Sequence, residues 1–237
     1  MRRLVLFTTL LLAACGGNGS GDGGGPDGNP GVTNECREGA SATSDSLLPM
    51  EVGDIWRYQV TEVGTGNPPY TKRQELTEEM TPPDEIEPVI VQLTTKATGQ
   101  TVNWLRRTGD QIVRVRQEDY DQAGLLERIT VYEPPKLRLD ESPERIAVGA
   151  SFDESYTAVV YDPAGVETGR TPTVDHWVVV SDDTPCDTPW GTLSCVQIHR
   201  ETTQGGISIK DYYFARGYGK VREDGGQIEE LTDCTLR

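Results

Sequence analysis

The sequence has few residues of the kinds that several functional classes require. Its 237 residues include two histidines and three phenylalanines, and 22 basic residues stand against 38 acidic ones. The resulting formal charge of −16 is repelled by nucleic acid and by anionic headgroups, and no stretch interleaves basic with aromatic residues. Nucleic-acid binding is therefore excluded. The acidity favours a solvated exterior over a specific acidic docking face.

The sequence also lacks a hydrophobic run long enough to span a membrane. The longest apolar stretch, residues 4–14, covers 11 residues and follows Arg2 and Arg3. A membrane-spanning helix needs about 20 residues. The stretch is therefore interpreted as a signal segment.

The end of this segment carries a short motif, Leu12-Ala13-Ala14-Cys15. It resembles the lipobox of bacterial lipoproteins. The resemblance implies a diacylglyceryl group on Cys15, removal of residues 1–14, and attachment to the membrane through the lipid at Cys15. Gly16, in place of Asp, favours the outer membrane in the cell envelope. The alternative is an ordinary cleaved signal peptide in which Cys15 is incidental.

The lipobox resemblance and the composition together imply three regions. Residues 1–14 form the signal peptide, and residues 15–46 form the lipidated cysteine with a flexible glycine-rich linker. Residues 16–31 contain no apolar side chain, so they cannot bury enough surface to become ordered. Residues 47–237 have the length of one β-rich globular domain.

Residues of this domain alternate between apolar and polar, which predicts an all-β fold with a single antiparallel, strongly curved sheet or a barrel or half-barrel. In the strand at 173–180, Asp175 and Trp177 face one side and Val174 and His176 the other. Residues 70–80, rich in Lys, Glu and Thr, are expected to form an edge strand. Strands are predicted at 89–95, 101–106, 111–117, 126–132, 156–161, 173–180, 193–200 and 207–214.

Four cysteines remain once Cys15 is assigned to lipid, and an exported protein lies in an oxidising compartment. Three pairings are possible. We favour Cys186 with Cys195, which bracket a plausible turn, and Cys36 with Cys234, which would tie the two ends of the domain. No C-x-x-C occurs and neither histidine is spaced as a ligand, so no metal site is predicted.

Three motifs resemble those of a loose group of exported, β-rich bacterial proteins and lipoproteins of uncharacterised function. They are Gly53 to Tyr58 (GDIWRY), Thr188 to Cys195 (TPWGTLSC) and Tyr212 to Val221 (YYFARGYGKV). Several members of the group are similar to the half-barrel of lipoprotein carriers, which implies an apolar concavity. This sequence departs from those carriers because it shows no helices to plug such a cavity.

Catalytic patterns are absent. Asp175 and His176 point to opposite faces of one strand, and Gly149 to Asp153 lacks the final glycine of a nucleophile elbow. We therefore expect no enzyme and no cofactor. The preferred function is a non-enzymatic binding or interaction module that contacts an envelope protein partner. The alternative is a barrel or half-barrel that holds a small apolar molecule between Trp104, Trp177 and Tyr213.

Overall fold

A computed structural model describes residues 34–36, 44–82, 86–204 and 206–237. Within these ranges the structure is almost entirely β-strand, and the single helix, α1 (Pro143–Ile146), has four residues. No helix in the described ranges has the length and apolar character that crossing a membrane requires. The prediction of an all-β fold is confirmed.

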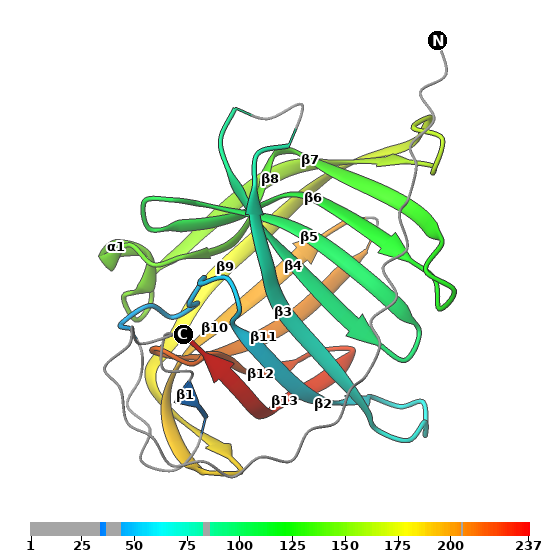
Figure 1. Ribbon diagram of the computed structural model, residues 1–237. Helices are drawn as coiled ribbons and strands as arrows, with labels where there is room; N and C mark the ends of the chain where they lie inside the picture. Colours follow the sequence, from blue (N-terminus) through cyan, green and yellow to red (C-terminus); the bar gives the residue numbers. More distant parts are fainter. Residues whose placement is uncertain (1–33, 37–43, 83–85, 205) are drawn as a thin grey trace, which may run out of the picture. The chain divides into compact units, whose positions relative to one another are not determined.

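Antiparallel strands form a closed barrel (Figure 1). In chain order the strands are β1 (Asn34–Glu35), β2 (Ile55–Glu62), β3 (Tyr70–Met80), β4 (Val89–Lys96), β5 (Gly99–Thr108), β6 (Gln111–Tyr120), β7 (Leu126–Asp140), β8 (Ser151–Tyr161), β9 (Glu167–Thr188), β10 (Gly191–Thr203), β11 (Ile207–Ala215), β12 (Gly219–Asp224) and β13 (Gln227–Leu236). From β2 to β13 each strand pairs with the next, and β13 pairs with β2 to close the ring. The short β1 also pairs with β13.

The alternation of side chains along each strand separates an inner from an outer face. On β9, Asp175 and Trp177 are 1% and 2% exposed, whereas Val174 on the other face is 39% exposed. The faces predicted for residues 173–180 are therefore confirmed. One end of the barrel contains an apolar group that we call the end cluster: Leu47, Leu137, Leu139, Trp177, Val179, Val196, Ile198, Tyr212 and Phe214.

Strand β3 contradicts the prediction of an edge strand at residues 70–80. It pairs with β2 on one side and with β4 on the other. Its charged residues serve two environments, because Lys72 is buried in the interior while Glu78 and Glu79 lie in water. The polar composition of this strand therefore reflects an outer face and a polar interior instead of a free edge.

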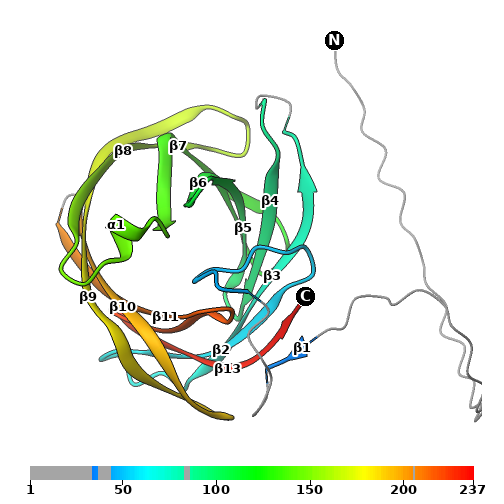
Figure 2. The ribbon, with the colours of Figure 1, turned by 90° about the vertical axis from the view of Figure 1, so that its left-hand side faces the viewer.

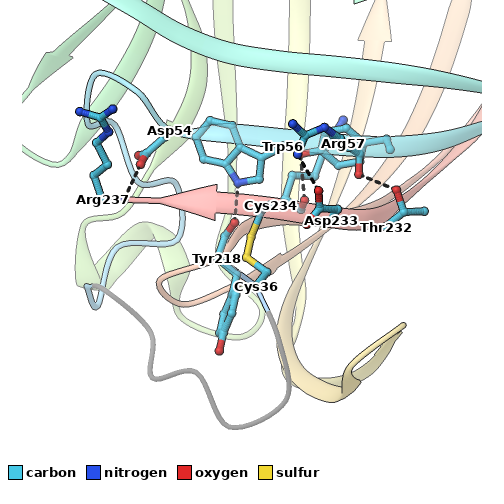
Figure 3. The surroundings of a disulfide bond; sticks show 11 residues. Cys36, Asp54, Trp56, Arg57, Tyr218, Thr232, Asp233, Cys234 and Arg237 are labelled. Atoms are coloured by element: carbon cyan, nitrogen blue, oxygen red, sulfur yellow. Dashed lines mark hydrogen bonds and ion pairs between the residues drawn. A yellow bond between two sulfur atoms is a disulfide. The ribbon is translucent and has the colours of Figure 1, made fainter. Parts of the chain in front are cut away.

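Two disulfides are present, and they have the pairings that the sequence favoured. Cys186 bonds to Cys195 within the β9–β10 hairpin, and Cys36 bonds to Cys234 on β13 (Figure 3). The backbone N–H of Cys36 also donates to the carbonyl of Cys234 at 2.9 Å. Residues 34–36, which the composition placed in the linker, thus pack with the barrel.

Two of the three sequence motifs meet beside the Cys36–Cys234 bond. Trp56 Nε1 donates to the carbonyl of Tyr218 at 2.7 Å (Figure 3), and the Tyr58 hydroxyl donates to the carbonyl of Lys220 at 3.0 Å. Gly219 makes this contact possible, because its φ is +89° and an added Cβ would lie 3.0 Å from Trp56 Nε1. The motifs therefore fasten β2 to the turn that leads into β12.

Residues 44–54 cross one end of the barrel (Figure 2). Leu47 is fully buried in the end cluster, and the carbonyl of Ser46 accepts a hydrogen bond from the Gly217 N–H at 2.7 Å. Arg107 donates to the carbonyl of Leu48 at 2.9 Å. Ile146 of α1 packs against the same cluster. This end is therefore filled by packed side chains, and the remaining interior space lies beyond them.

Candidate functional site

The barrel interior contains a polar cavity of about 290 Å³. Side chains from β3 to β7 and from β10 to β13 line it, and none of them is aliphatic. The lining includes the exposed Lys96 near the β4–β5 turn, so the cavity reaches solvent at the end opposite residues 44–54. A narrower space lined by Leu48, Trp56 and Phe214 adjoins it and shares Arg138 with it. The polar cavity thus adjoins a separate, smaller space that is lined mainly by apolar side chains.

One part of the wall is a group of lysines and glutamates that we call the paired cluster: Lys72, Lys210, Lys220, Glu223 and Glu229. Lys220 Nζ lies 2.6 Å from a carboxylate oxygen of Glu229 and also contacts Glu223. Lys72 pairs with Glu229, and Lys210 pairs with Glu223. Apart from Lys210, each side chain is less than one-tenth exposed. These cations therefore have carboxylate partners.

Burial and mutual attraction set the protonation of the paired cluster. Burial, together with the positive charge of Lys220, lowers the pKa of Lys72 to about 7. Burial also acts to lower the pKa of Lys220, but Glu223 and Glu229 outweigh it and raise that pKa above its ordinary value. Burial acts to raise the pKa of Glu223, but Lys220 and Lys210 hold it well below its usual range. The paired cluster is consequently close to neutral at pH 7.

The other part of the wall is a group that we call the arginine cluster: Arg114, Lys136, Arg138 and Arg200. The carboxylate nearest to it is Asp175, which is 1% exposed. Asp175 Oδ2 lies 3.5 Å from Lys136 Nζ and 3.9 Å from Arg200 Nη1, while Oδ1 accepts a hydrogen bond from Thr202. Among the residues that the structure describes, no carboxylate lies within 4.0 Å of the guanidinium nitrogens of Arg114 or Arg138.

The arginine cluster has more positive charge than its surroundings balance. Burial and the neighbouring Arg114 lower the pKa of Arg138 to about 10. Burial and Arg200 lower the pKa of Lys136 to about 7, although Asp175 opposes them. Three buried polar atoms of the cavity lining have no hydrogen-bond partner: Arg114 Nε, Arg200 Nε and Asn103 Oδ1. Native proteins usually satisfy such atoms, so this part of the wall has the donors and charge to receive a ligand.

The charge of the cavity is opposite to that of the chain. With Lys96, eight lysine and arginine side chains line it, against the two glutamates of the paired cluster. The whole chain has 22 basic and 38 acidic residues. More than a third of the basic residues thus surround one cavity in an acidic protein, a distribution that attracts anions.

The three aromatic residues predicted to hold an apolar ligand do not converge on this cavity. Trp177 stacks between Phe152 and Tyr212 in the interior, with their ring centroids at 6.4 and 6.2 Å. The preceding residue, Asn103, faces inward and lines the cavity. Because neighbouring residues of a strand face opposite sides, Trp104 lies on the outer face of β5. Tyr213 follows the inward-facing Tyr212 and so also faces outward.

Arg116 covers the Trp104 ring and Arg222 covers that of Tyr213. The structure therefore contradicts an apolar site built from Trp104, Trp177 and Tyr213. The physical reason is the period of two, which sends two of the rings outward.

Both histidines lie on the barrel wall away from the cavity lining. His176 Nδ1 is 2.6 Å from Asp153, and its Nε2 is 3.4 Å from the Ser151 hydroxyl. This Ser–His–Asp arrangement across β8 and β9 escaped the sequence search, which compared His176 with Asp175. The His176 and Asp153 side chains are 46% and 67% exposed, and the nearby amide of Gly149 already donates to Val179. The His176–Asp153 pair is thus open to solvent, and the Gly149 N–H already has a backbone acceptor.

Two further predictions concern other parts of the chain. Cys15, the predicted lipidation site, lies outside the described residues. Among the described residues, no group of three or more His, Cys, Asp and Glu side chains could hold a metal ion.

Sequence reasoning missed the cavity because its basic residues are spread over seven strands. The available signal is their phase on each strand. Lys72 shares a face with the buried Leu76, Arg200 with Ile198, and Lys210 with Tyr212. A basic residue in phase with core residues is a candidate for the interior, yet only the closed barrel brings these positions together.

The chain matches no protein-family model, and it has no recognisable sequence similarity to a curated protein. Two solved structures are similar in fold. One, from Bacteroides fragilis NCTC 9343, is provisionally described as an exported protein with a YmcC-like fold; it has 13% identity and a TM-score of 0.47, covering 78% of this chain and 97% of its own. The other is provisionally described as a lipoprotein from Parabacteroides distasonis ATCC 8503, with 11% identity and a TM-score of 0.40 over 81% and 97% of the two chains. Similarity at this level does not indicate what the present chain does.

Proposed function

We propose that the barrel binds a small, hydrophilic anion in its interior cavity and does not transform it chemically. One observation carries this proposal: an acidic chain places eight basic side chains and two carboxylates around a single cavity. The four cations of the arginine cluster share one neighbouring carboxylate, Asp175. Such an excess of positive charge away from bulk water is unfavourable, and a bound anion would reduce that cost. The cavity thus supports ligand binding, with a ligand whose charge is opposite to the interior.

The sequence favoured a different function, an interaction module that binds an envelope protein. The closed ring of strands gives this function less support. A free sheet edge would support strand addition by such a partner, but β2 to β13 all have neighbours on both sides. We therefore favour the ligand-binding function. The resemblance of residues 12–15 to a lipobox supports a further part of the proposal, in which a lipid on Cys15 holds the barrel at the outer membrane of the cell envelope.

Isothermal titration calorimetry of the full chain with small anions tests the proposal, with inorganic phosphate as the first probe. Arg138→Gln removes a cation that has no carboxylate partner, and it should weaken binding by about tenfold or more. Arg170→Gln is the matched control, because Arg170 lies on the outer wall in contact with Glu133 and Glu167. Equal affinities for wild type and both variants, or no binding of any anion, would contradict an interior site.

A further inference from the structure

The two parts of the cavity wall differ in how much positive charge is left without a carboxylate partner. In the paired cluster, two glutamates face three lysines, and burial already favours the neutral form of Lys72. In the arginine cluster, four cations have Asp175 as their neighbouring carboxylate. Three of these cations are guanidinium groups, which stay charged at neutral pH. The unbalanced positive charge is therefore concentrated at Arg114, Arg138 and Arg200, and it exceeds one elementary charge.

The geometry of the free donors narrows the kind of anion. Arg114 and Arg200 each have a buried Nε without a partner. A guanidinium group presents its N–H donors as a planar fork that matches phosphate and carboxylate oxygens. A phosphate monoester has a charge of about −1.5 to −2 at pH 7 and three acceptor oxygens, so it balances more of the excess than a carboxylate does.

A third unpartnered atom indicates what else the ligand contains. Asn103 is 4% exposed, its amide nitrogen donates to Gln92 at 3.1 Å, and its Oδ1 has no donor. Buried acceptors are usually satisfied, and an O–H or N–H group of a ligand would satisfy this one. Neutral polar side chains beside it, including Gln74, Thr94 and Gln117, also suit hydroxyl groups. The lining offers no aliphatic surface to a hydrocarbon chain.

We propose that the ligand is a phosphate monoester of a small hydroxylated molecule, with its phosphate on Arg114, Arg138 and Arg200 and a hydroxyl group donating to Asn103. The cavity of about 290 Å³ sets the size limit. This volume lies close to the lower end of the range of about 300–1,000 Å³ for small-molecule sites, so the ligand is small. This assignment rests on the proposed function, since it names the ligand class for the same cavity.

Calorimetric titration of the full chain with three matched probes tests the assignment. Glycerol phosphate, glycerate and glycerol share a hydroxylated body and differ in charge. We expect glycerol phosphate to bind at least about tenfold more tightly than glycerate, and glycerol to show no measurable heat. Arg114→Gln should abolish this preference, and Asn103→Leu should weaken glycerol phosphate more than inorganic phosphate, whereas the outer-wall Arg170→Gln should change neither.

The outcomes separate this inference from the proposed function. If glycerate binds as tightly as glycerol phosphate, the cavity binds anions but the phosphate assignment is wrong. If no probe binds to a chain whose near-ultraviolet circular dichroism shows native packing, the proposed function fails as well. Binding to vesicles that contain phosphatidic acid, without binding of glycerol phosphate, would place the phosphate on a lipid headgroup and overturn the assignment to a soluble ester.

Discussion

Replacing Lys136 by methionine should change how the stability of the barrel depends on pH. The Lys136 amine faces Arg114 on β6, Arg138 on β7, Tyr156 on β8, Asp175 on β9 and Arg200 on β10. Burial and Arg200 lower its pKa from 10.5 to about 7. In the unfolded chain the amine recovers its ordinary pKa, so above about pH 7 unfolding takes up a proton.

The sign and size of the effect follow from this difference. Because the unfolded state binds more protons, the free energy of unfolding rises with pH between the folded and unfolded pKa values, by about 1.4 kcal/mol per pH unit. Between about pH 7.5 and 9.5, Lys136 should therefore add about 2.5 kcal/mol to the stability of the wild type. Below about pH 7 the amine is protonated in both states, and the full destabilisation by its buried charge is present.

Urea denaturation of wild type and Lys136→Met at several pH values measures this contribution. Lys72 and all other groups are common to both proteins, so the difference between the two curves isolates Lys136. The difference in the free energy of unfolding between the two proteins should change by about 2.5 kcal/mol between about pH 7.5 and 9.5, with an unchanged m-value. Lys96→Met is the control, because its exposed amine remains in water and its curve should run parallel to that of the wild type. Parallel curves for Lys136→Met would refute the reasoning.

Three other substitutions test the architecture by urea denaturation. Removing the long disulfide as Cys36→Ser with Cys234→Ser should lower stability by up to about 5 kcal/mol, because the bond closes a loop with a sequence separation of 198 residues; unchanged stability would contradict the chain-entropy account. Glu229→Gln should cost about 3 to 5 kcal/mol by leaving two buried lysines without their shared carboxylate, and a loss below about 1 kcal/mol would mean that water already screens them. Gly219→Ala should cost about 1 to 3 kcal/mol because of its positive φ and the neighbouring indole, whereas Gly226→Ala, which meets nothing within 4 Å, should have little effect.

Local patterns in the sequence were sufficient for the strands and their faces. The period of two at residues 173–180 places Trp177 and Val174 on opposite faces, as they lie in the structure, because the period of a strand is a local property. Both faces have bulky side chains, so the sequence did not tell which face is buried. The disulfide pairing was also accessible, because Cys186 and Cys195 bracket a plausible turn and their pairing leaves Cys36 for Cys234. These features depend on the residues themselves or on their near neighbours in the chain.

The closure of the sheet and the contents of its interior could not be predicted in the same way. Composition made residues 70–80 look like an edge, because Lys72 cannot be told from an outward lysine until β3 is known to pair on both sides. Arg114 and Arg200 are likewise far apart in sequence and meet only across the closed ring. The charge of the cavity is therefore a property of the complete register and not of any one segment.

The junction of β2 with β13 has a consequence for the time course of folding. Arg57 and Asp233, which form an ion pair across this junction, are 176 residues apart, and closing so long a loop directly is entropically costly. We therefore expect the junction to form after the intervening hairpins. Cys36 bonds to Cys234 on the same strand, β13, with a separation of 198 residues, so we expect this disulfide to form late as well. The time at which Cys36 and Cys234 become oxidised would therefore report when the barrel closes. Alkylating free thiols at intervals during refolding, with the Cys186–Cys195 hairpin as an early internal standard, would time that step directly.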